Sequence, residues 1–147
     1  MSRTKPPGVK VIRVTSARQI DLAALSRLFF TVGMRRRTAS RMRTAIAASS
    51  DVYAAYRGDR LVGFGRLLSD GAYYGSIWDM AVEPDMQHTG IGAAILDELL
   101  RCARSRRLVM LGLFTATHNR EFYERYGFKF HPDIRAMTHL PKSNDDE

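Results

Sequence analysis

Residues 87–92, Gln-His-Thr-Gly-Ile-Gly, form a glycine-containing loop between two strongly patterned segments. Residues 74–82, before the loop, have the pattern of a strand, and Pro84 ends it because proline lacks a ladder donor. Residues 90–104, after it, carry apolar side chains at helical spacing. A helix N-terminus offers unpaired N–H donors and about half a positive charge, and glycine lets the backbone approach an anion. The loop therefore predicts an α/β domain with a phosphate site, or a turn whose glycines only permit tight packing.

Two better-known phosphate loops do not fit these residues. A dinucleotide fingerprint requires a third Gly or Ala after the first two glycines, and Ile95 stands at that position. A P-loop requires Gly-Lys followed by Ser or Thr, which the sequence lacks. If these residues bind phosphate, they do so in a fold other than the dinucleotide-binding and P-loop folds.

Strand and helix patterns alternate along the rest of the chain, without a repeat or a long linker. We expect one domain over residues 9–140, with polar tails at 1–8 and 141–147 that are disordered. The predicted strands are 9–15, 52–57, 61–68, 74–82, a buried strand at 109–114, and 134–140. The predicted helices are 16–31, 39–48, 90–104 and 119–126.

Composition restricts the classes of function. No apolar run approaches the roughly 20 residues that span a bilayer, so we expect no membrane partner. The one cysteine, Cys102, cannot form an internal disulfide, which favours a reducing compartment and a cytoplasmic protein. The net charge of +8 fits an anionic partner, or arginines on solvated helix faces. A nucleic-acid-binding module is the weaker alternative, because no helix-turn-helix, zinc-ligand or ribonucleoprotein signature accompanies the charge.

Two segments carry a resemblance to a known family. Residues 78–92 (WDMAVEPDMQHTGIG) resemble the core motif of the GNAT N-acetyltransferases, a strand ending in Val-x-Pro before a Gln/Arg-x-x-Gly-x-Gly/Ala loop. Residues 121–128 (EFYERYGF) resemble the family's Phe-Tyr-x-x-x-Gly-Phe segment. The resemblance implies a single α/β GNAT domain, with a mixed, mostly antiparallel sheet of about six or seven strands and about four helices. The sheet would be splayed at the strand before the glycine loop.

The resemblance also implies a cofactor and its contacts. Such enzymes move the acetyl group of acetyl-CoA directly to an amine, and backbone amides of the loop hold the pyrophosphate. Backbone groups of the preceding strand line the pantetheine arm, and one N–H polarises the thioester carbonyl as an oxyanion donor. The residues implied for cofactor binding are Met80, Ala81, Val82, Gln87, His88, Thr89, Gly90, Ile91, Gly92 and Ala93.

Catalytic roles follow from the same resemblance. Tyr123 matches the tyrosine that many members use as general acid toward the CoA sulfur. Trp78 stands where many members carry a Glu or His base, and it cannot accept a proton. Asp79 is the favoured base, although strand alternation points it to the other face unless a bulge intervenes. Glu83 is a weaker candidate, and a water chain is a third. No metal is expected.

The acceptor stays open between several classes. Residues 69–79, with Ile77-Trp78-Asp79, resemble the plant-type serotonin (arylalkylamine) N-acetyltransferases. A small aromatic amine would then bind a pocket of aromatic residues that could equally be core residues, namely Phe29, Phe30, Tyr73 and Trp78. The alternatives are a peptide, lysine or polyamine acetyltransferase and a non-catalytic acyl-CoA-binding protein. A homodimer is possible in this family, paired through the exposed final strand.

Overall fold

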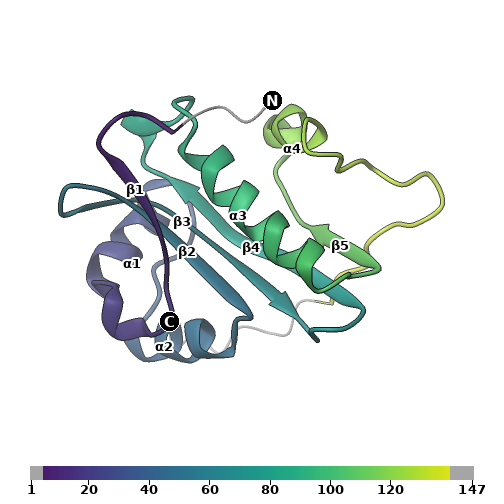
Figure 1. Ribbon diagram of the computed structural model, residues 1–147, viewed down its shortest axis with the longest axis horizontal. Helices are drawn as coiled ribbons and strands as arrows, with labels where there is room; N and C mark the ends of the chain where they lie inside the picture. Colours follow the sequence, from purple (N-terminus) through teal and green to yellow (C-terminus); the bar gives the residue numbers. More distant parts are fainter. Residues whose placement is uncertain (1–4, 140–147) are drawn as a thin grey trace.

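The computed structural model describes residues 5–139, whose five strands form one sheet (Figure 1). The strands lie in the sheet in chain order, the first four pair antiparallel, and the last pair is parallel. The sheet is therefore mixed and mostly antiparallel, as predicted. The strands are β1 (Val9–Arg13), β2 (Asp51–Arg57), β3 (Arg60–Ser69), β4 (Tyr74–Val82) and β5 (Met110–Leu113).

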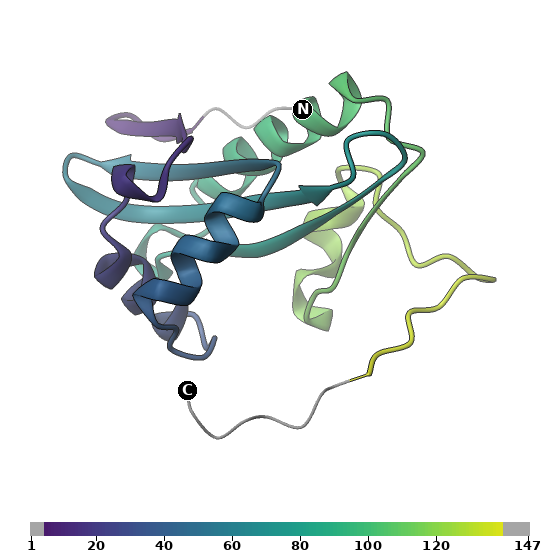
Figure 2. The same ribbon diagram turned by 90° about the horizontal axis from the view of Figure 1, so that it is seen from below.

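Helices cover both faces of this sheet (Figure 2). The longest, α3, packs across one face against β2, β3 and β4, while α1 and α2 cover the opposite face. The four α-helices are α1 (Leu22–Thr31), α2 (Ala39–Ala48), α3 (Ile91–Ser105) and α4 (Arg120–Glu124). Three 3-10 helices accompany them: η1 (Ala17–Gln19), η2 (Pro84–Met86) and η3 (Thr117–Asn119).

Two hydrophobic cores hold the layers together, one on each face of the sheet. On the α3 face, Ile91, Ile95 and Leu99 pack on residues of β2, β3 and β4. On the other face, Leu25 and Phe29 of α1 pack with strand residues around Phe64. The helices α1 and α3 therefore bury their apolar faces against opposite faces of the sheet.

The helix predicted over residues 16–31 is divided into two. Ser16 caps η1 through a capping box with Gln19, and the backbone at Ile20 is extended. Asp21 then caps α1 by accepting hydrogen bonds from the backbone N–H groups of Ala23 and Ala24, at 2.9 and 3.1 Å. Two successive capping residues start two helices, because each side chain offers its oxygen to unpaired first-turn donors.

The strand predicted at 134–140 is wrong as far as residue 139, because residues 134–139 have no regular secondary structure. Leu140 and the tail at 141–147 lie outside the described residues, as do residues 1–4. The sheet consequently has five strands rather than six or seven. The β5 strand, expected to be buried, lies at the edge, and its side chains alternate between exposed and half-buried.

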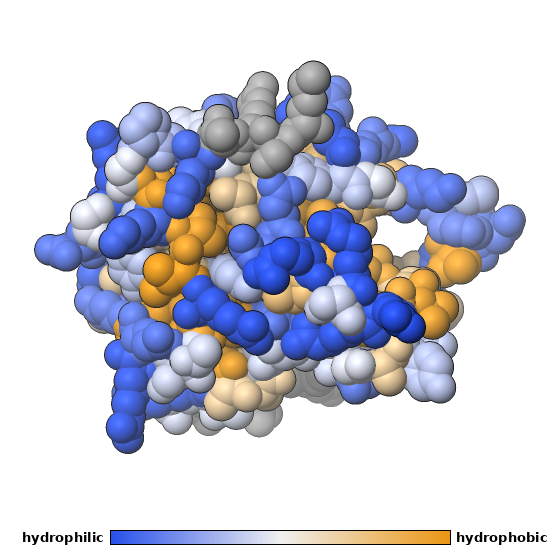
Figure 3. Space-filling model, viewed as in Figure 1, coloured by the Kyte–Doolittle hydropathy of each residue, from blue (hydrophilic) through white to orange (hydrophobic). Residues whose placement is uncertain are grey.

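The surface reflects both the charge of the chain and this edge position. Hydrophilic groups dominate the face that Figure 3 shows; hydrophobic groups form one band left of centre and a second group at the right, where β5 and the following segment lie. The exposed apolar residues of that region are Val109, Met110, Phe114, Phe130, Ile134 and Met137. Within residues 5–139, no helix has the length and apolar character needed to cross a membrane.

Candidate active site

The glycine loop connects β4 to α3 in a backbone conformation that few residues adopt. His88 has φ +62° and Gly90 has φ +97°, and Gly90 is the residue immediately before the helix. The Gln87 side chain donates through Nε2 to the Val82 carbonyl, at 3.1 Å, and the Thr89 hydroxyl donates to the Met86 carbonyl, at 2.5 Å. These bonds tie the loop to itself and to the end of β4, so its amides have a fixed direction.

The N-terminus of α3 is open to an anion. The first helical bond runs from the Ala94 N–H to the Gly90 carbonyl, at 3.0 Å, so the preceding three amides lack helical acceptors. No side chain caps this end, and the first turn contains no acidic residue. The helix is 15 residues long, which gives its dipole full strength. The amides of Ile91, Gly92 and Ala93 are therefore suited to phosphate oxygens.

A splay opens in the sheet beside this helix end. The parallel pairing of β4 with β5 ends at Ile77 and Leu113, whereas β4 continues to Val82 with only β3 beside it (Figure 1). The Trp78 ring lies at the mouth of the splay, 5.4 Å from the ring of Phe114 just beyond β5. Residues 78–82 thus present one backbone edge without a strand partner, as the predicted pantetheine contacts require.

A β-bulge interrupts β4 at this point. Phe64 pairs with Ala81 and Arg66 with Trp78, so Asp79 and Met80 together oppose the single residue Gly65. Asp79 has φ +58°, in the left-handed region. A Cβ at position 65 would lie 2.5 Å from the Met80 sulfur, which explains the glycine. Strand alternation predicts that Asp79 and Trp78 point to opposite faces of the sheet unless a bulge intervenes. This bulge is therefore the feature that allows both side chains to share one face.

The side-chain contacts confirm that placement. Trp78 donates through Nε1 to the Ser76 hydroxyl, at 2.6 Å, and Ser76 faces away from the α3 core that contains Ile77. The Asp79 carboxylate contacts Arg37, from the segment between α1 and α2. Both side chains therefore lie on the α1 and α2 face of the sheet.

Asp79 is enclosed by two arginines. Arg37 donates to both carboxylate oxygens, at 2.7 and 2.8 Å, and Arg66 donates through Nε, at 2.7 Å. The Asp79 side chain is only 8% exposed. Burial alone would raise the pKa of this carboxyl, but the hydrogen bonds and charges of the two arginines outweigh it and hold the pKa below its usual value. A low pKa and occupied oxygens are unfavourable for a general base.

Glu83, the weaker candidate, is also paired. It lies just after β4, and its backbone N–H donates to the Val62 carbonyl at 2.9 Å. Its carboxylate is 3.7 Å from the guanidinium of Arg60. Neither carboxylate predicted as a base is therefore free of a cationic partner.

Tyr123, the predicted acid, lies in α4 at the edge of the α3 core and is 9% exposed. The rings of Phe122 and Phe128 pack edge-on against it, with centroids 4.9 and 5.9 Å away. No described residue hydrogen-bonds its hydroxyl, and burial raises the pKa of that hydroxyl. Tyr123 thus stays protonated at neutral pH with a free donor, which suits an acid.

The loop, the splay and α4 come together around Gly92. A Cβ at Gly92 would lie 3.6 Å from the Phe122 ring and 3.6 Å from the Val82 side chain. The first turn of α3, the end of β4 and the helix of Tyr123 therefore meet at one place, although they are separate in the sequence. The structure brings together the residues predicted for the cofactor and for the acid, and their roles stay predictions.

The four aromatic residues predicted for the acceptor do not form one pocket. Phe29 is 1% exposed, and its ring packs edge-on against Phe64 in the core, which is a correction to its predicted role. Phe30, 55% exposed, lies beneath the guanidinium of Arg36, and Tyr73 lies in the turn between β3 and β4. Only Trp78, 36% exposed, lies at the splay.

Three residues contribute to this site although the sequence analysis did not predict them there. Phe114, Arg37 and Arg66 meet Trp78 or Asp79 from segments 13 to 42 residues away. Phe114 ends a strand that the sequence pattern predicts. Its proximity to Trp78, however, depends on the parallel register of β4 and β5, which the local pattern does not predict. The arginines belong to runs of charge that read equally well as solvated surface.

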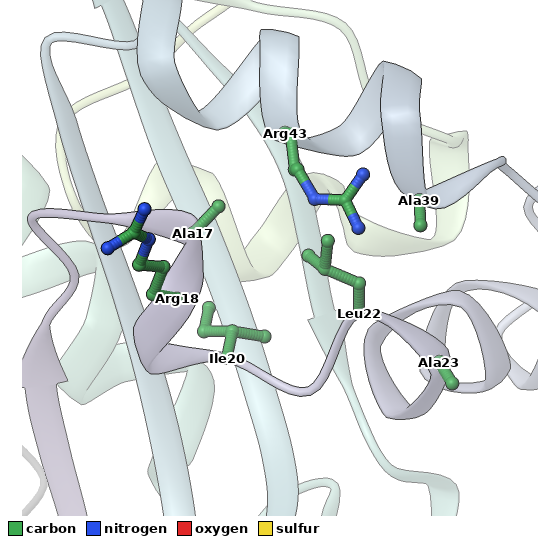
Figure 4. A pocket seen from close by; sticks show the side chains of 7 residues that line it. All are labelled: Ala17, Arg18, Ile20, Leu22, Ala23, Ala39 and Arg43. Carbon is green, nitrogen blue, oxygen red and sulfur yellow. The ribbon is translucent and has the colours of Figure 1, made fainter.

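A separate hollow of about 600 Å³ lies between η1, α1 and α2 (Figure 4). Its lining residues, none of which belongs to β4, the loop or α4, are Ala17, Arg18, Ile20, Leu22, Ala23, Ala39 and Arg43. It is thus distinct from the splay. Elsewhere in the part of the chain described, no group of three His, Cys, Asp or Glu side chains could hold a metal ion.

The fold and this site define an α/β domain of the acetyltransferase class. A solved GNAT-family acetyltransferase from Streptococcus pneumoniae TIGR4 superposes with a TM-score of 0.77 at 25% identity, covering 92% of this chain and 99% of that one. A sequence profile of the acetyltransferase (GNAT) domain matches residues 48–130. The chain belongs to the GNAT acetyltransferase family, whose members use acetyl-CoA and act on amine acceptors.

Plant proteins are among the relatives of known name. The chain is 33% identical over 128 residues to serotonin N-acetyltransferase 2, chloroplastic, of Oryza sativa subsp. japonica, covering 84% of this chain and 64% of that protein. It is 30% identical over 154 residues to histone acetyltransferase TAP1 of Glycine max, covering 96% of this chain and 67% of that protein. The chain therefore spans just under two thirds of the length of the rice relative.

Proposed function

We propose that the protein transfers the acetyl group of acetyl-CoA to the nitrogen of a small aromatic amine. The observation that carries this proposal is the meeting of the open α3 N-terminus, the splay and Tyr123 around Gly92. One surface thereby offers phosphate donors, an unpaired strand edge and a protonated hydroxyl. A phosphate-bearing thioester needs these three groups in this order along its length.

The residues present fit acetyl-CoA. The amides of Ile91, Gly92 and Ala93 would hold the pyrophosphate, with Gly90 before them keeping the approach clear of a Cβ. The backbone edge of Met80 to Val82 would line the pantetheine arm in the splay. When bound, acetyl-CoA supplies an acetyl thioester whose carbonyl carbon accepts the amine.

The reaction requires two proton transfers, one to the departing sulfur and one from the amine. Tyr123 donates its proton to the departing sulfur, since burial keeps its hydroxyl protonated at neutral pH. The amine must lose a proton, and an amine with a pKa near 10 pays roughly 4 kcal/mol to be neutral at pH 7. Asp79 and Glu83 are paired with arginines, so this proton passes to water rather than to a carboxylate.

Two features support an aromatic monoamine as the acceptor. Trp78 and Phe114 place an aromatic pair at the mouth of the splay, which can pack on a planar ring. A polyamine would need free carboxylates, whereas Asp79 beside the splay is held by two arginines and Glu83 lies 3.7 Å from Arg60. The rice relative bears the name of a serotonin acetyltransferase, and the soybean relative is named for histones, so lysine is the competing acceptor.

The experiment is calorimetric titration with acetyl-CoA, followed by a thiol-release assay with serotonin, tryptamine, spermidine and a lysine peptide. We expect micromolar binding and release of CoA with the two aromatic amines. Trp78→Ala should raise KM for those amines and leave acetyl-CoA affinity unchanged, with Tyr73→Ala as the matched aromatic control outside the splay. Turnover of the lysine peptide alone would replace the acceptor class, and absence of acetyl-CoA binding would refute the function itself.

A further inference from the structure

Three elements converge on one buried carboxylate beside the proposed site. Asp79 belongs to the β4 bulge, Arg66 to β3, and Arg37 to residues 32–38 between α1 and α2. The exposed fraction is 32% for the Arg37 side chain and 14% for Arg66. The cluster holds two cations and one anion in a half-buried place. Such groups gain little net stability over apolar ones, so their value lies in the geometry that they enforce.

Arg37 is itself fixed at both ends. Its backbone N–H donates to the Ser26 hydroxyl at 3.3 Å, and that hydroxyl donates to the Arg37 carbonyl at 3.1 Å. Its guanidinium carbon lies 4.6 Å from the centre of the Phe29 ring while its nitrogens hold Asp79. The loop of residues 32–38 is thus fastened to α1 on one side and to β4 on the other.

Arg66 completes the cluster from beneath. Its Nε holds Asp79, and its Nη1 donates to the Ser49 hydroxyl at 3.2 Å, at the C-terminal end of α2. The Asp79 carboxylate is therefore connected to both ends of α2. Arg37 links it to the loop before this helix, and Arg66 links it to the residue after the helix.

The backbone at Asp79 requires such an anchor. A φ of +58° costs a non-glycine residue roughly 1–2 kcal/mol, although Asp tolerates it better than most. Relaxation to a regular strand would remove the bulge, turn Asp79 to the α3 face and shift every following residue of β4. Met80 to Val82, whose backbone lines the splay, follow directly.

We propose that Asp79 is a positioning residue: held by Arg37 and Arg66, it fixes the β4 bulge, so that the backbone of Met80 to Val82 lines the splay. The same contacts anchor the loop of residues 32–38 beside the proposed acceptor site. The proposal rests on the proposed function for its catalytic consequence, but the anchoring of the bulge does not depend on turnover. Asp79 acts through the backbone and transfers no proton.

The first test measures amide hydrogen exchange in the protein without ligands. Asp79→Gly accommodates φ +58° but removes the anchor, and it should speed exchange at residues 80–82 and 34–38 at least about tenfold. Asp51→Asn is the matched control, because the Asp51 carboxylate is also buried between two arginines, Arg13 and Arg106, outside the splay. Unchanged exchange at 80–82 in folded Asp79→Gly would overturn the proposal, whatever the acceptor proves to be.

The second test separates positioning from proton transfer. Asp79→Asn keeps a side chain of the same shape that can accept hydrogen bonds, and it should retain more turnover than Asp79→Gly. For Asp79→Gly we expect kcat to fall about 10- to 100-fold and the acetyl-CoA Kd to rise by more than about threefold, because the backbone of Met80 to Val82 would line the pantetheine arm. The acidic limb of the kcat/KM profile against pH should stay in place in Asp79→Asn. Loss of that limb would make Asp79 the base and refute a purely positioning role.

Discussion

Gly90 offers the most direct test of the proposal that the glycine loop binds acetyl-CoA. The residue precedes α3 with φ +97°, a conformation that L residues with a Cβ rarely adopt. Gly90→Ala either keeps this angle under strain or relaxes toward negative φ. In the relaxed state the first amides of α3 no longer point as they do now, and binding must restore them.

The magnitude follows from that strain. Left-handed backbone costs a residue with a Cβ roughly 1–2 kcal/mol, and each 1.4 kcal/mol is tenfold in affinity. Gly90→Ala should therefore weaken acetyl-CoA binding by roughly 5- to 30-fold, measured by calorimetric titration. The free energy of unfolding should fall only by the part of this strain that the free protein keeps, at most about 1–2 kcal/mol, which lowers Tm by at most about 2–8 °C in a domain of this size.

The matched control is Gly71→Ala, in the turn between β3 and β4. Gly71 has φ +78°, and a Cβ there would meet no atom within 4 Å. The control should lose a comparable free energy of unfolding while its acetyl-CoA affinity stays within twofold of the original. Equal losses of affinity in both variants would show that binding follows global stability, and an unaffected Gly90→Ala would refute the loop assignment.

Four further outcomes are expected. Tyr123→Phe should lower kcat by about 100-fold or more with little change in acetyl-CoA Kd, and unchanged turnover in stopped-flow assays would exclude the acid role. Two arginines lower the pKa of Asp79 despite its burial, so this stabilisation is complete above the ordinary pKa of 3.8 and is lost as pH falls through the lower folded value. As pH falls below about 3.8 the original protein should therefore lose more free energy of unfolding in urea than Asp79→Asn does, and parallel losses would contradict the pairing. With water as proton acceptor, the kcat/KM profile should shift with the pKa of the acceptor amine; one common limb for all amines would indicate a protein base. If β5 pairs with a second copy, size-exclusion chromatography should show a dimer for the original protein and a monomer for Met110→Lys. A monomeric original protein would rule out pairing through β5.

Local patterns predicted the elements whose ends are marked by strong signals. The bounds of β4 and α2 match the prediction residue for residue, because Pro84 follows the strand and Thr38 caps the helix. The helix after the loop shifts by one residue, since Gly90 is its cap rather than its first turn. The long first helix failed because Asp21 is a second capping residue inside an apolar periodicity that continues past it.

The strand predicted at 134–140 failed for a different reason. Its alternating residues fit a strand locally, but a strand forms only where a partner edge holds it. In the structure residues 134–139 lie without regular structure while the outer edge of β5 has no neighbouring strand among the described residues. Pairing of that kind is a tertiary property, which composition and alternation do not encode.

The candidate site divides along the same line. The positions of the glycine loop and of Tyr123 could be predicted because each lies in a short contiguous motif; their roles stay predictions. The contact of Arg37 with Asp79 joins residues 42 positions apart, and nothing in an arginine run identifies the one residue that turns inward. Phe29 was misassigned because an aromatic residue of an amphipathic helix reads alike in a core and in a pocket.

The tryptophan at position 78, where many family members carry a base, and the pairing of Asp79 with two arginines have the same chemical consequence: neither side chain can accept a proton readily. The bulge places both side chains on the face where an amine would arrive, yet one has no basic atom and the other is neutralised. Two guanidiniums around one carboxylate leave a net positive charge beside the splay. Positive charge disfavours the ammonium form of an approaching amine and so lowers its pKa. Under the proposed function, the cluster would thus assist the loss of the amine proton without accepting it, and it would select against acceptors that carry several positive charges.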